Sequence, residues 1–388
     1  MAIEKNIPSQ LDLDDLAAEV ELELPGSMEQ NIVEFEGEAE NMDIEVIAED
    51  DGGVTIDFEP TDNRGQEGDF YANLAEDMPE RELSRIAGEL LGEFDANKAS
   101  RQEWEDAYAN GLELLGFNYE ERSQPFRGAS GVTHPLLAEA ATQFQAQAFN
   151  ELLPASGPVR TAIVGAETRD RQQQSQRVRQ FMNYYITNVM EEYTPELDQM
   201  LFYLPLAGST FKKVYFDENL GRAVSKFVPA EHLVVPYETS DLETCPNITQ
   251  TLRISLNELR KKQIGGFYID IPVIPAQGDS DSVTDEINRI DGLSPSQIDY
   301  DCTLLECHVD LDLEGYEEVG EDGEPTGIKV PYVVTISQDN GQILSIRRNY
   351  REEDDKKSKI QYFVHYKFLP GFGFYGLGLI HTIGGLSR

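Results

Sequence analysis

The distribution of charge constrains this chain more than any other feature of its sequence. The first 80 of its 388 residues include 25 Asp and Glu but only Lys5 and Arg64, a net charge of −23. The whole chain carries −41, so more than half of the excess lies in this first stretch. Isolated apolar residues among like charges cannot bury enough surface to form a core. We therefore predict an acidic, disordered tail over residues 1–79, either solubilising or acting as a docking arm, and a globular body over 80–388.

The charge also limits the classes of partner. Tight static binding of nucleic acid needs clustered Lys and Arg that displace counterions, and 31 basic residues against 72 acidic ones do not favour it. DNA that slides past without adhering is compatible with such a surface. No run of 18 apolar residues is present, so we expect no membrane span. Cys245, Cys302 and Cys307 form no C-x-x-C pair and are expected to be reduced structural thiols.

Apolar residues at helical spacing predict four helices in the first half of the body. We expect a turn over 95–100 between the first two helices, an N-cap at Thr133 for the third, and an exposed or partner-facing basic patch on the fourth. The predicted stripes are Leu83, Ile86, Leu90 and Leu91; Trp104, Tyr108, Leu112 and Leu115; Leu137, Ala141, Phe144, Ala148 and Leu152; and Val178, Phe181, Met182, Tyr185 and Val189. The basic residues of the fourth helix are Arg169, Arg171, Arg177 and Arg179.

The stretch LFYLPLAGSTFKKVYFD, residues 201–217, changes from a helical to a strand pattern. Pro205 and Gly208 are expected to stop the helix, with a positive φ at Gly208. Lys212 and Lys213 are adjacent, so in a strand they point to opposite faces, one toward solvent and the other toward an acidic neighbour. The turn DENLGR then leads into AVSKFVPAEHLVVPY, which predicts a hairpin.

Strand patterns dominate the C-terminal third. Four runs between Cys302 and Leu369 predict an antiparallel meander, with a hairpin turn at Asp339–Gly341. We also predict a short strand over 159–165, a short helix over 255–264, and helix and loop over 275–300. The fold class is therefore α+β, with helical segments and antiparallel hairpins.

Two motifs suggest ligands, and each lacks part of its required context. Gly371, Gly373 and Gly376 match G-x-G-x-x-G, but a dinucleotide site needs a βαβ unit and an acidic residue about 20 positions later, and only 12 residues follow. We expect an aromatic and glycine-rich turn between sheet and helix instead. The acidic stretch 310–321, DLDLEGYEEVGE, has the spacing of a calcium loop, but predicted strands flank it where an EF-hand needs helices. We expect a hairpin loop, with incidental cation binding as the alternative.

No catalytic, cofactor-binding or metal-binding residue is nominated by the sequence. The five histidines, at positions 134, 232, 308, 365 and 381, have no metal-ligand spacing with one another. Nucleophile-elbow, P-loop and H-E-x-x-H motifs are missing. We therefore expect a chain that is not an enzyme and that takes no cofactor.

Three stretches are similar to one family. They are PFRGASGVTHPLLAEAATQFQAQAFNELLP (125–154), LPLAGSTFKKVYFDENLGRAVSKFVPAEHLVVPY (204–237) and VHYKFLPGFGFYGLGLIHTIGGLSR (364–388). With intervening matches they cover roughly residues 100–388, and they resemble the portal proteins of tailed bacteriophages, in the version found in short-tailed phages. The family pattern continues into tunnel and stem helices beyond the last residue here, so we expect the N-terminal, wing-like part of a portal protein.

The resemblance implies a structural subunit of the virion. About twelve copies would form a ring at the portal vertex of the capsid, assembled in the host cytoplasm. Double-stranded DNA would pass through its channel during packaging and ejection, and the ring would dock the terminase, the tail adaptor and the major capsid protein, without a membrane. The candidate structural or interface residues are Leu137, Phe144, Leu152, Pro205, Gly208, Phe211, Lys212, Lys213, Pro229, Gly371, Gly373 and Gly376.

Two other functions stay open at this point. An acidic, non-catalytic adaptor or scaffold protein would have the same charge and no active site. A nucleotide-binding enzyme would use the glycine-rich stretch 371–376. A ring in solution favours the portal subunit, and nucleotide binding that depends on the glycines favours the enzyme.

Overall fold

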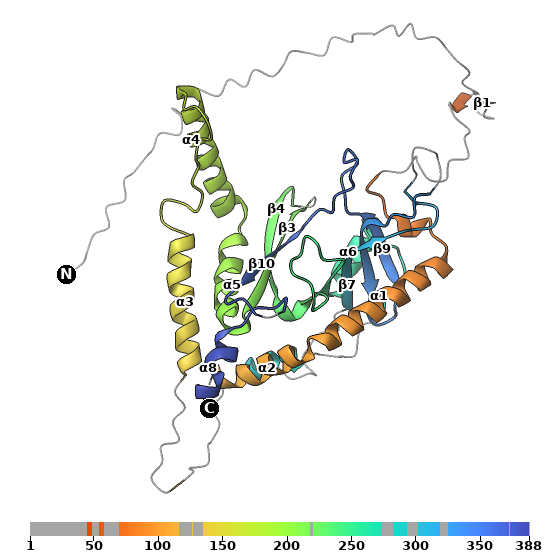
Figure 1. Ribbon diagram of the computed structural model, residues 1–388. Helices are drawn as coiled ribbons and strands as arrows, with labels where there is room; N and C mark the ends of the chain where they lie inside the picture. Colours follow the sequence, from red (N-terminus) through yellow and green to blue (C-terminus); the bar gives the residue numbers. More distant parts are fainter. Residues whose placement is uncertain are drawn as a thin grey trace. The chain divides into compact units, whose positions relative to one another are not determined.

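The computed structural model describes ten segments of the chain, which fall into two compact units, Met1–Arg64 and Gly65–Arg388 (Figure 1). The described residues are 45–48, 54–57, 70–115, 126, 135–217, 220–273, 282–292, 302–318, 325–371 and 373–387. In the first unit, β1 (Glu45–Ala48) and β2 (Val54–Asp57) pair antiparallel, with Glu45 opposite Asp57. The remainder of the predicted disordered tail before residue 70 lies outside the described residues.

Helices and antiparallel strands mix in the second unit, which agrees with the predicted α+β class. Its helical elements among the described residues are η1 (Leu74–Glu76), α1 (Glu80–Ser100), α2 (Gln102–Leu112), η2 (Glu113–Leu115), α3 (Leu136–Leu152), α4 (Arg169–Tyr184), the π-helical turn η3 (Tyr185–Val189), α5 (Tyr193–Ala207), η4 (Ala230–His232), α6 (Leu256–Ile264), α7 (Ser282–Ile290) and α8 (Leu379–Ser387). Its strands there are β3 (Ser209–Asp217), β4 (Arg222–Pro229), β5 (Leu233–Val234), β6 (Asn247–Ile254), β7 (Cys302–Leu311), β8 (Val330–Ser337), β9 (Ile343–Arg348) and β10 (Phe363–Lys367).

The described strands of this unit form two antiparallel sheets. The larger has the order β5-β6-β7-β8-β9 and the smaller the order β10-β3-β4. The expected hairpin of β3 and β4 is confirmed, with Lys213 opposite Lys226. The predicted four-strand meander is wrong for its last strand. Strand β10 does not pair with β9 but with β3, where Val364 lies opposite Lys212. A strand pattern of period two predicts a strand but not its partner, and the segment 349–362 carries the chain from one sheet to the other.

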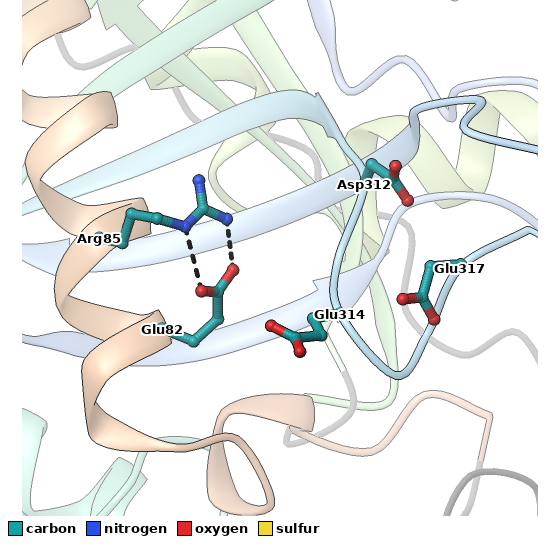
Figure 2. Close-up of a pocket in the computed structure, with 5 residues that line it drawn as sticks. All are labelled: Glu82, Arg85, Asp312, Glu314 and Glu317. Carbon is teal, nitrogen blue, oxygen red and sulfur yellow. Dashed lines mark hydrogen bonds and ion pairs between the residues drawn. The ribbon is translucent and has the colours of Figure 1, made fainter. Parts of the chain in front are cut away.

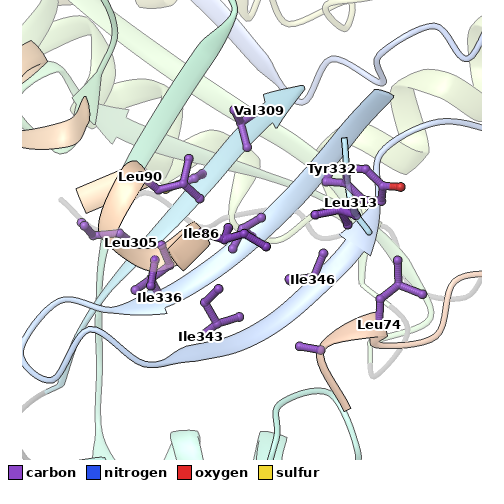
Figure 3. Packing of buried hydrophobic residues seen from close by; sticks show 14 of the residues in the cluster. Leu74, Ile86, Leu90, Leu305, Val309, Leu313, Tyr332, Ile336, Ile343 and Ile346 are labelled. Atoms are coloured by element: carbon purple, nitrogen blue, oxygen red, sulfur yellow. The ribbon is translucent and has the colours of Figure 1, made fainter. Parts of the chain in front are cut away.

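Helix α1 covers one face of the larger sheet. Ile86, Leu90 and Phe94, spaced by four residues, are buried against Leu305 and Ile336 of the sheet, as Figure 3 shows for most of them. Burial of one such side chain contributes roughly 1.5–3 kcal/mol. Leu74, Ala75 and Met78 belong to the same cluster, so residues 70–79, assigned above to the acidic tail, are part of the folded unit.

Several expected element boundaries are wrong. Residues 95–100 are helical to Ser100, and only Arg101 separates α1 from α2. Residues 159–165 form no strand. Pro205 does not stop α5 but lies inside it, and the helix ends at Ala207 with Gly208 as its cap. The proline is tolerated there because it lies in the last turn, where few backbone hydrogen bonds remain to be lost. Pro135 occupies the N-cap of α3, while Thr133 lies outside the described residues.

A buried guanidinium stands at the break between α1 and α2. Arg101, 1% exposed, forms an ion pair of 2.6 Å with Glu105 and donates to the carbonyls of Ala230 and Leu233 at 2.9 and 2.8 Å. It also donates to the hydroxyl of Tyr375, 2.9 Å away, whose ring stacks on Trp104 with centroids 4.8 Å apart. Arg101 therefore fixes α1 and α2, the chain before β5, and the segment after β10 to one another.

Replacing Arg101 with Met should destabilise the protein by about 3–5 kcal/mol, because the buried carboxylate of Glu105 loses its cation and the carbonyls lose their donor. The matched control is Arg85→Met on α1, where a half-exposed guanidinium pairs with Glu82 and Glu89. This change should lower the free energy of unfolding by about 1 kcal/mol or less. Urea unfolding of both variants tests this, and equal losses would contradict the role given to Arg101.

No helix within the described residues is both long enough and apolar enough to span a membrane.

Candidate assembly site at the glycine-rich junction

The end of α5 and the start of β3 meet the glycine-rich segment 369–378. Gly208 has φ of +84° and caps α5, with its N–H donating to the carbonyl of Leu204 at 2.9 Å. The expected positive φ is thus confirmed. A Cβ on Gly208 would lie 2.4 Å from the backbone nitrogen of Gly378 and 2.5 Å from the carbonyl oxygen of Gly376. Only glycine fits this position, because both the left-handed backbone and the close approach exclude a side chain.

The glycines of GFGFYG approach the protein's own backbone. A Cβ on Gly376 would lie 2.4 Å from the carbonyl oxygen of Gly208, and one on Gly371 would lie 2.5 Å from that of Tyr375. A Cβ on Gly373 would meet the ring of Tyr237 at 2.6 Å. The segment is a turn between β10 and α8, as expected from the sequence. Its small residues serve chain packing here, in contrast to a phosphate loop, where glycines open space for a ligand.

Hydrogen bonds fix the segment to β3 and β10. The N–H of Gly376 donates to Ser209 Oγ at 2.7 Å, and Ser209 Oγ lies 3.0 Å from Nε2 of His365. Burial, with a smaller effect from Lys367, lowers the pKa of His365 to about 3. The neutral ring stacks against Phe211 and Phe374, with centroids 4.5 Å away in each case. The candidate residue Phe211 is therefore a fully buried core residue at this junction.

Substitution of Gly208 by Ala should cost about 1–3 kcal/mol more than the same change at Gly221, because only Gly208 would drive its Cβ into backbone atoms. Gly221, in the β3–β4 turn, also has a positive φ of +61° but has nothing within 4 Å of an added Cβ. The difference between the two free energies of unfolding isolates the close contact from the strain in φ. Equal losses in the free energy of unfolding would show that the close contact with the glycine segment does not affect stability.

Lys213 links the two sheets. Its Nζ lies 2.5 Å from a carboxylate oxygen of Glu306 on β7, and Nε2 of His308 is 2.7 Å from the same oxygen. Burial alone would raise the pKa of Glu306, but the charge of Lys213 and the hydrogen bond from His308 outweigh it and hold that pKa below its usual range. Burial lowers the pKa of His308, so its neutral ring donates to the carboxylate. The expected acidic neighbour of one lysine is therefore found.

Lys212 points to the other face, but the expectation that it reaches solvent is wrong. Its side chain is 3% exposed, and its Nζ lies 4.1 Å from the ring centroid of Tyr193 on α5. Among the described residues Nζ has no hydrogen-bond partner. Burial lowers the pKa of Lys212 to about 8, although the charges of Glu196 and Glu192 act in the opposite direction. Alpha-helix α5 covers this face of β3, which the alternation within the strand does not reveal.

The two lysines should respond in opposite ways to substitution by Met. Lys213→Met leaves Glu306 without its cation and should cost about 3 kcal/mol or more. Lys212→Met removes a buried charge that has no hydrogen bond and should leave stability within about 1 kcal/mol or raise it. The pKa of Lys212 is lower in the folded than in the unfolded state. The free energy of unfolding of wild type, relative to that of Lys212→Met, should therefore rise from pH 7 to pH 9. Chemical unfolding at both pH values tests this, and equal destabilisation by the two variants would contradict it.

Side chains protect the outer edge of β4. The N–H groups of Ser225 and Phe227 donate to the carboxylates of Glu192 and Glu196, at 3.2 and 2.7 Å. The N–H of Ala223 donates to the hydroxyl of Tyr185, 2.9 Å away. Every second N–H over 223–227 is therefore occupied by a side chain where a neighbouring strand would bind.

The remaining sequence candidates separate into core and surface. Leu137 is fully buried on α3, where it packs in a cluster with Leu206 of α5 and Ile380 of α8. Phe144 is only partly buried, in edge-to-face contact with Phe368 at 5.3 Å, so a full core cost for its truncation is not expected. Leu152 is half exposed. Pro229 ends β4, opposite Thr210.

The acidic loop after β7 lines a cavity with the start of α1. Figure 2 shows Asp312, Glu314 and Glu317 beside Glu82, which forms an ion pair with Arg85. Strands β7 and β8 flank the loop, as the hairpin prediction required. Within the described residues no group of three or more His, Cys, Asp or Glu side chains is arranged to hold a metal ion. All three cysteines are buried, and none of them forms a disulfide bond.

Sequence analysis missed the polar groups that hold the unit together: the buried Arg101 and Glu105, and the partly buried Glu192, Glu196 and Glu306. In a chain with 72 acidic residues, charge alone does not mark a buried carboxylate. The only available signal was position, since Arg101 interrupts the apolar stripes of two consecutive helices.

Comparisons with known proteins do not assign a family. A scan against protein-family models gives no match, and a search of curated proteins gives no significant match.

Proposed function

We propose that this chain is a structural subunit of a bacteriophage portal ring, corresponding to the wing-like part of the subunit. In this role it lines or supports the passage for double-stranded DNA at one capsid vertex. The ring docks the terminase during packaging and the tail adaptor afterwards, and it contacts the major capsid protein. The acidic surface implied by a charge of −41 limits adhesion of the passing phosphates.

The observation that carries the proposal is the packing together of the three stretches that resemble portal proteins. Leu137 of α3, from the first stretch, packs in one cluster with Leu206 at the end of α5, from the second stretch, and with Ile380 of α8, from the third. Strand β3 of the second stretch pairs with β10 of the third, and Gly208 contacts the backbone of Gly376 and Gly378. Residues separated by about 240 positions, such as Leu137 and Ile380, thus build one structural unit, which supports a common origin for the three similarities.

The polar chemistry of the junction also supports a structural role. The charged groups described there have partners within the chain, as in the pair of Lys213 with Glu306, or are covered by α5, as Lys212 is. The glycines contact backbone atoms of the same chain. These features suit a rigid building block better than a nucleotide-binding enzyme, whose glycine loop must stay accessible to phosphate.

The mass of the full chain in solution tests the proposal. We expect a closed ring of about twelve copies, since identical subunits joined by one repeated contact close into cyclic assemblies. Mass photometry over a range of protein concentrations measures this directly. A monomer at every concentration would overturn the portal assignment and favour the acidic adaptor.

A further inference from the structure

Helix α4 has no packed face against the segments that the structure describes. None of its 16 residues, Arg169–Tyr184, is buried. It is held by a cap, where Thr168 accepts from the N–H of Arg171, and by hydrogen bonds with the preceding segment. Among these, Ser175 donates to Thr161 at 2.8 Å, and Asn183 accepts from the N–H of Val159 at 2.8 Å. Helices of this length are marginal in water, and most of their stability in proteins comes from an apolar face that packs.

The unpacked side of α4 is apolar and continues onto the β3–β4 hairpin. Val178, Phe181 and Tyr185 lie on one stripe by helical spacing, and the Phe181 side chain is 60% exposed. The ring of Phe181 contacts that of Tyr185, whose hydroxyl accepts from Ala223. Ala223 is the cross-strand partner of Phe216, which is 63% exposed. We call Val178, Phe181, Val214 and Phe216 the arm surface.

The helical part of the arm surface lies in a basic stretch of an acidic protein. Residues 158–189 contain five arginines and only Glu167 and Asp170, a net charge of +3 in a chain of −41. None of these arginines forms an ion pair within the segments that the structure describes. Arg177 is one helical turn from Phe181 and shares its face. An acidic surface with an aromatic border would complement both features.

The same chain carries such a surface on its larger sheet. Glu82, Asp312, Glu314 and Glu317 line the cavity of Figure 2, where Arg85 is the only basic residue among those drawn. Tyr316 belongs to the same loop, and Arg348 lies over both Tyr316 and Phe70, 5.8 and 4.9 Å from their centroids. Phe70 in turn contacts Tyr71, whose side chain is about half exposed.

We infer that the arm surface of one copy docks on the acidic cavity of a second copy of this chain. This inference rests on the proposed function and names the contact that joins neighbouring subunits. The two surfaces belong to different elements, the arm to α4 and the smaller sheet and the cavity to α1 and the larger sheet. A contact between unlike surfaces is heterologous, so a pair of copies still has one free arm and one free cavity. Further copies can therefore add until a ring closes, whereas a like-with-like contact stops at a dimer.

The test uses the full chain and measures its mass by sedimentation velocity. Three variants should each raise the protein concentration needed for half-assembly at least tenfold. They are Phe181→Ser and Arg177→Glu on the arm, and the double variant Glu314→Arg with Glu317→Arg at the cavity. Combining Arg177→Glu with the cavity variant should restore part of the loss, because the two charges are exchanged. Circular dichroism must stay that of wild type, so that loss of assembly is not loss of folding.

Matched controls lie on α6. Ile264→Ser removes an exposed apolar side chain, and Lys261→Glu reverses an exposed charge, both on a helix that contributes no residue to either surface. These controls should assemble like wild type. Arm or cavity variants that assemble like the controls would overturn the inference while the ring itself, and the portal proposal, stand. A wild-type assembly that depends on the arm but stops at two or three copies would support the docking contact and contradict the ring.

A duplex DNA of 30 base pairs, measured by fluorescence anisotropy at two salt concentrations, tests the competing occupant. If Arg177→Glu weakens DNA binding and leaves assembly unchanged, the arm contacts phosphate and the inference is overturned. Unchanged DNA binding with lost assembly supports it.

Discussion

One buried cation determines how the helices and sheets of the folded unit fit together. The guanidinium of Arg101 would be costly to bury alone, and its position is acceptable only because Glu105, three backbone carbonyls and the hydroxyl of Tyr375 all surround it. Those partners come from three separate parts of the chain. The same charge therefore constrains all of them. It fixes the positions of the α1–α2 break, the segment at the start of β5 and the glycine segment relative to one another.

The two sheets are held together by a partly buried ion pair. The pair of Lys213 with Glu306 spans from β3 to β7, and the neutral ring of His308 completes the environment of the carboxylate. Around it the contacts are apolar or between backbones, as at Gly208 and Gly376. A few directional interactions thus set the geometry, while the larger apolar clusters, such as that of α1 on its sheet, provide most of the free energy.

Local patterns allowed most elements to be predicted, but not the pairing of strands that are distant in sequence. The alternation in 209–229 and the turn at Asp339–Gly341 specify hairpins, because both strands and the turn lie close in sequence. The pairing of β10 with β3 joins residues about 150 positions apart, and a period of two contains no information about that choice. The burial of Lys212 was missed for a different reason, because alternation within a strand does not show which of its faces the preceding helix covers.

At the candidate site, the sequence predicted the conformation of Gly208 but not the contact that requires it. A glycine between a helix and a strand indicates a left-handed cap. The backbone of Gly376 and Gly378 that approaches it comes from the far end of the chain. Similarly, the stripe of Val178, Phe181 and Tyr185 was predicted as a helix face, and its exposure became visible only when the rest of the fold was known.

The capped edge of β4 has a consequence for the behaviour of many copies at high local concentration. Because Tyr185, Glu192 and Glu196 occupy the outward N–H groups of residues 223–227, a strand from another molecule would have to displace two carboxylates to hydrogen-bond there. On this side, crowded subunits are prevented from merging into a continuous intermolecular sheet. Disordered aggregation through that edge is thereby disfavoured, and contacts made by side chains can direct which molecules associate.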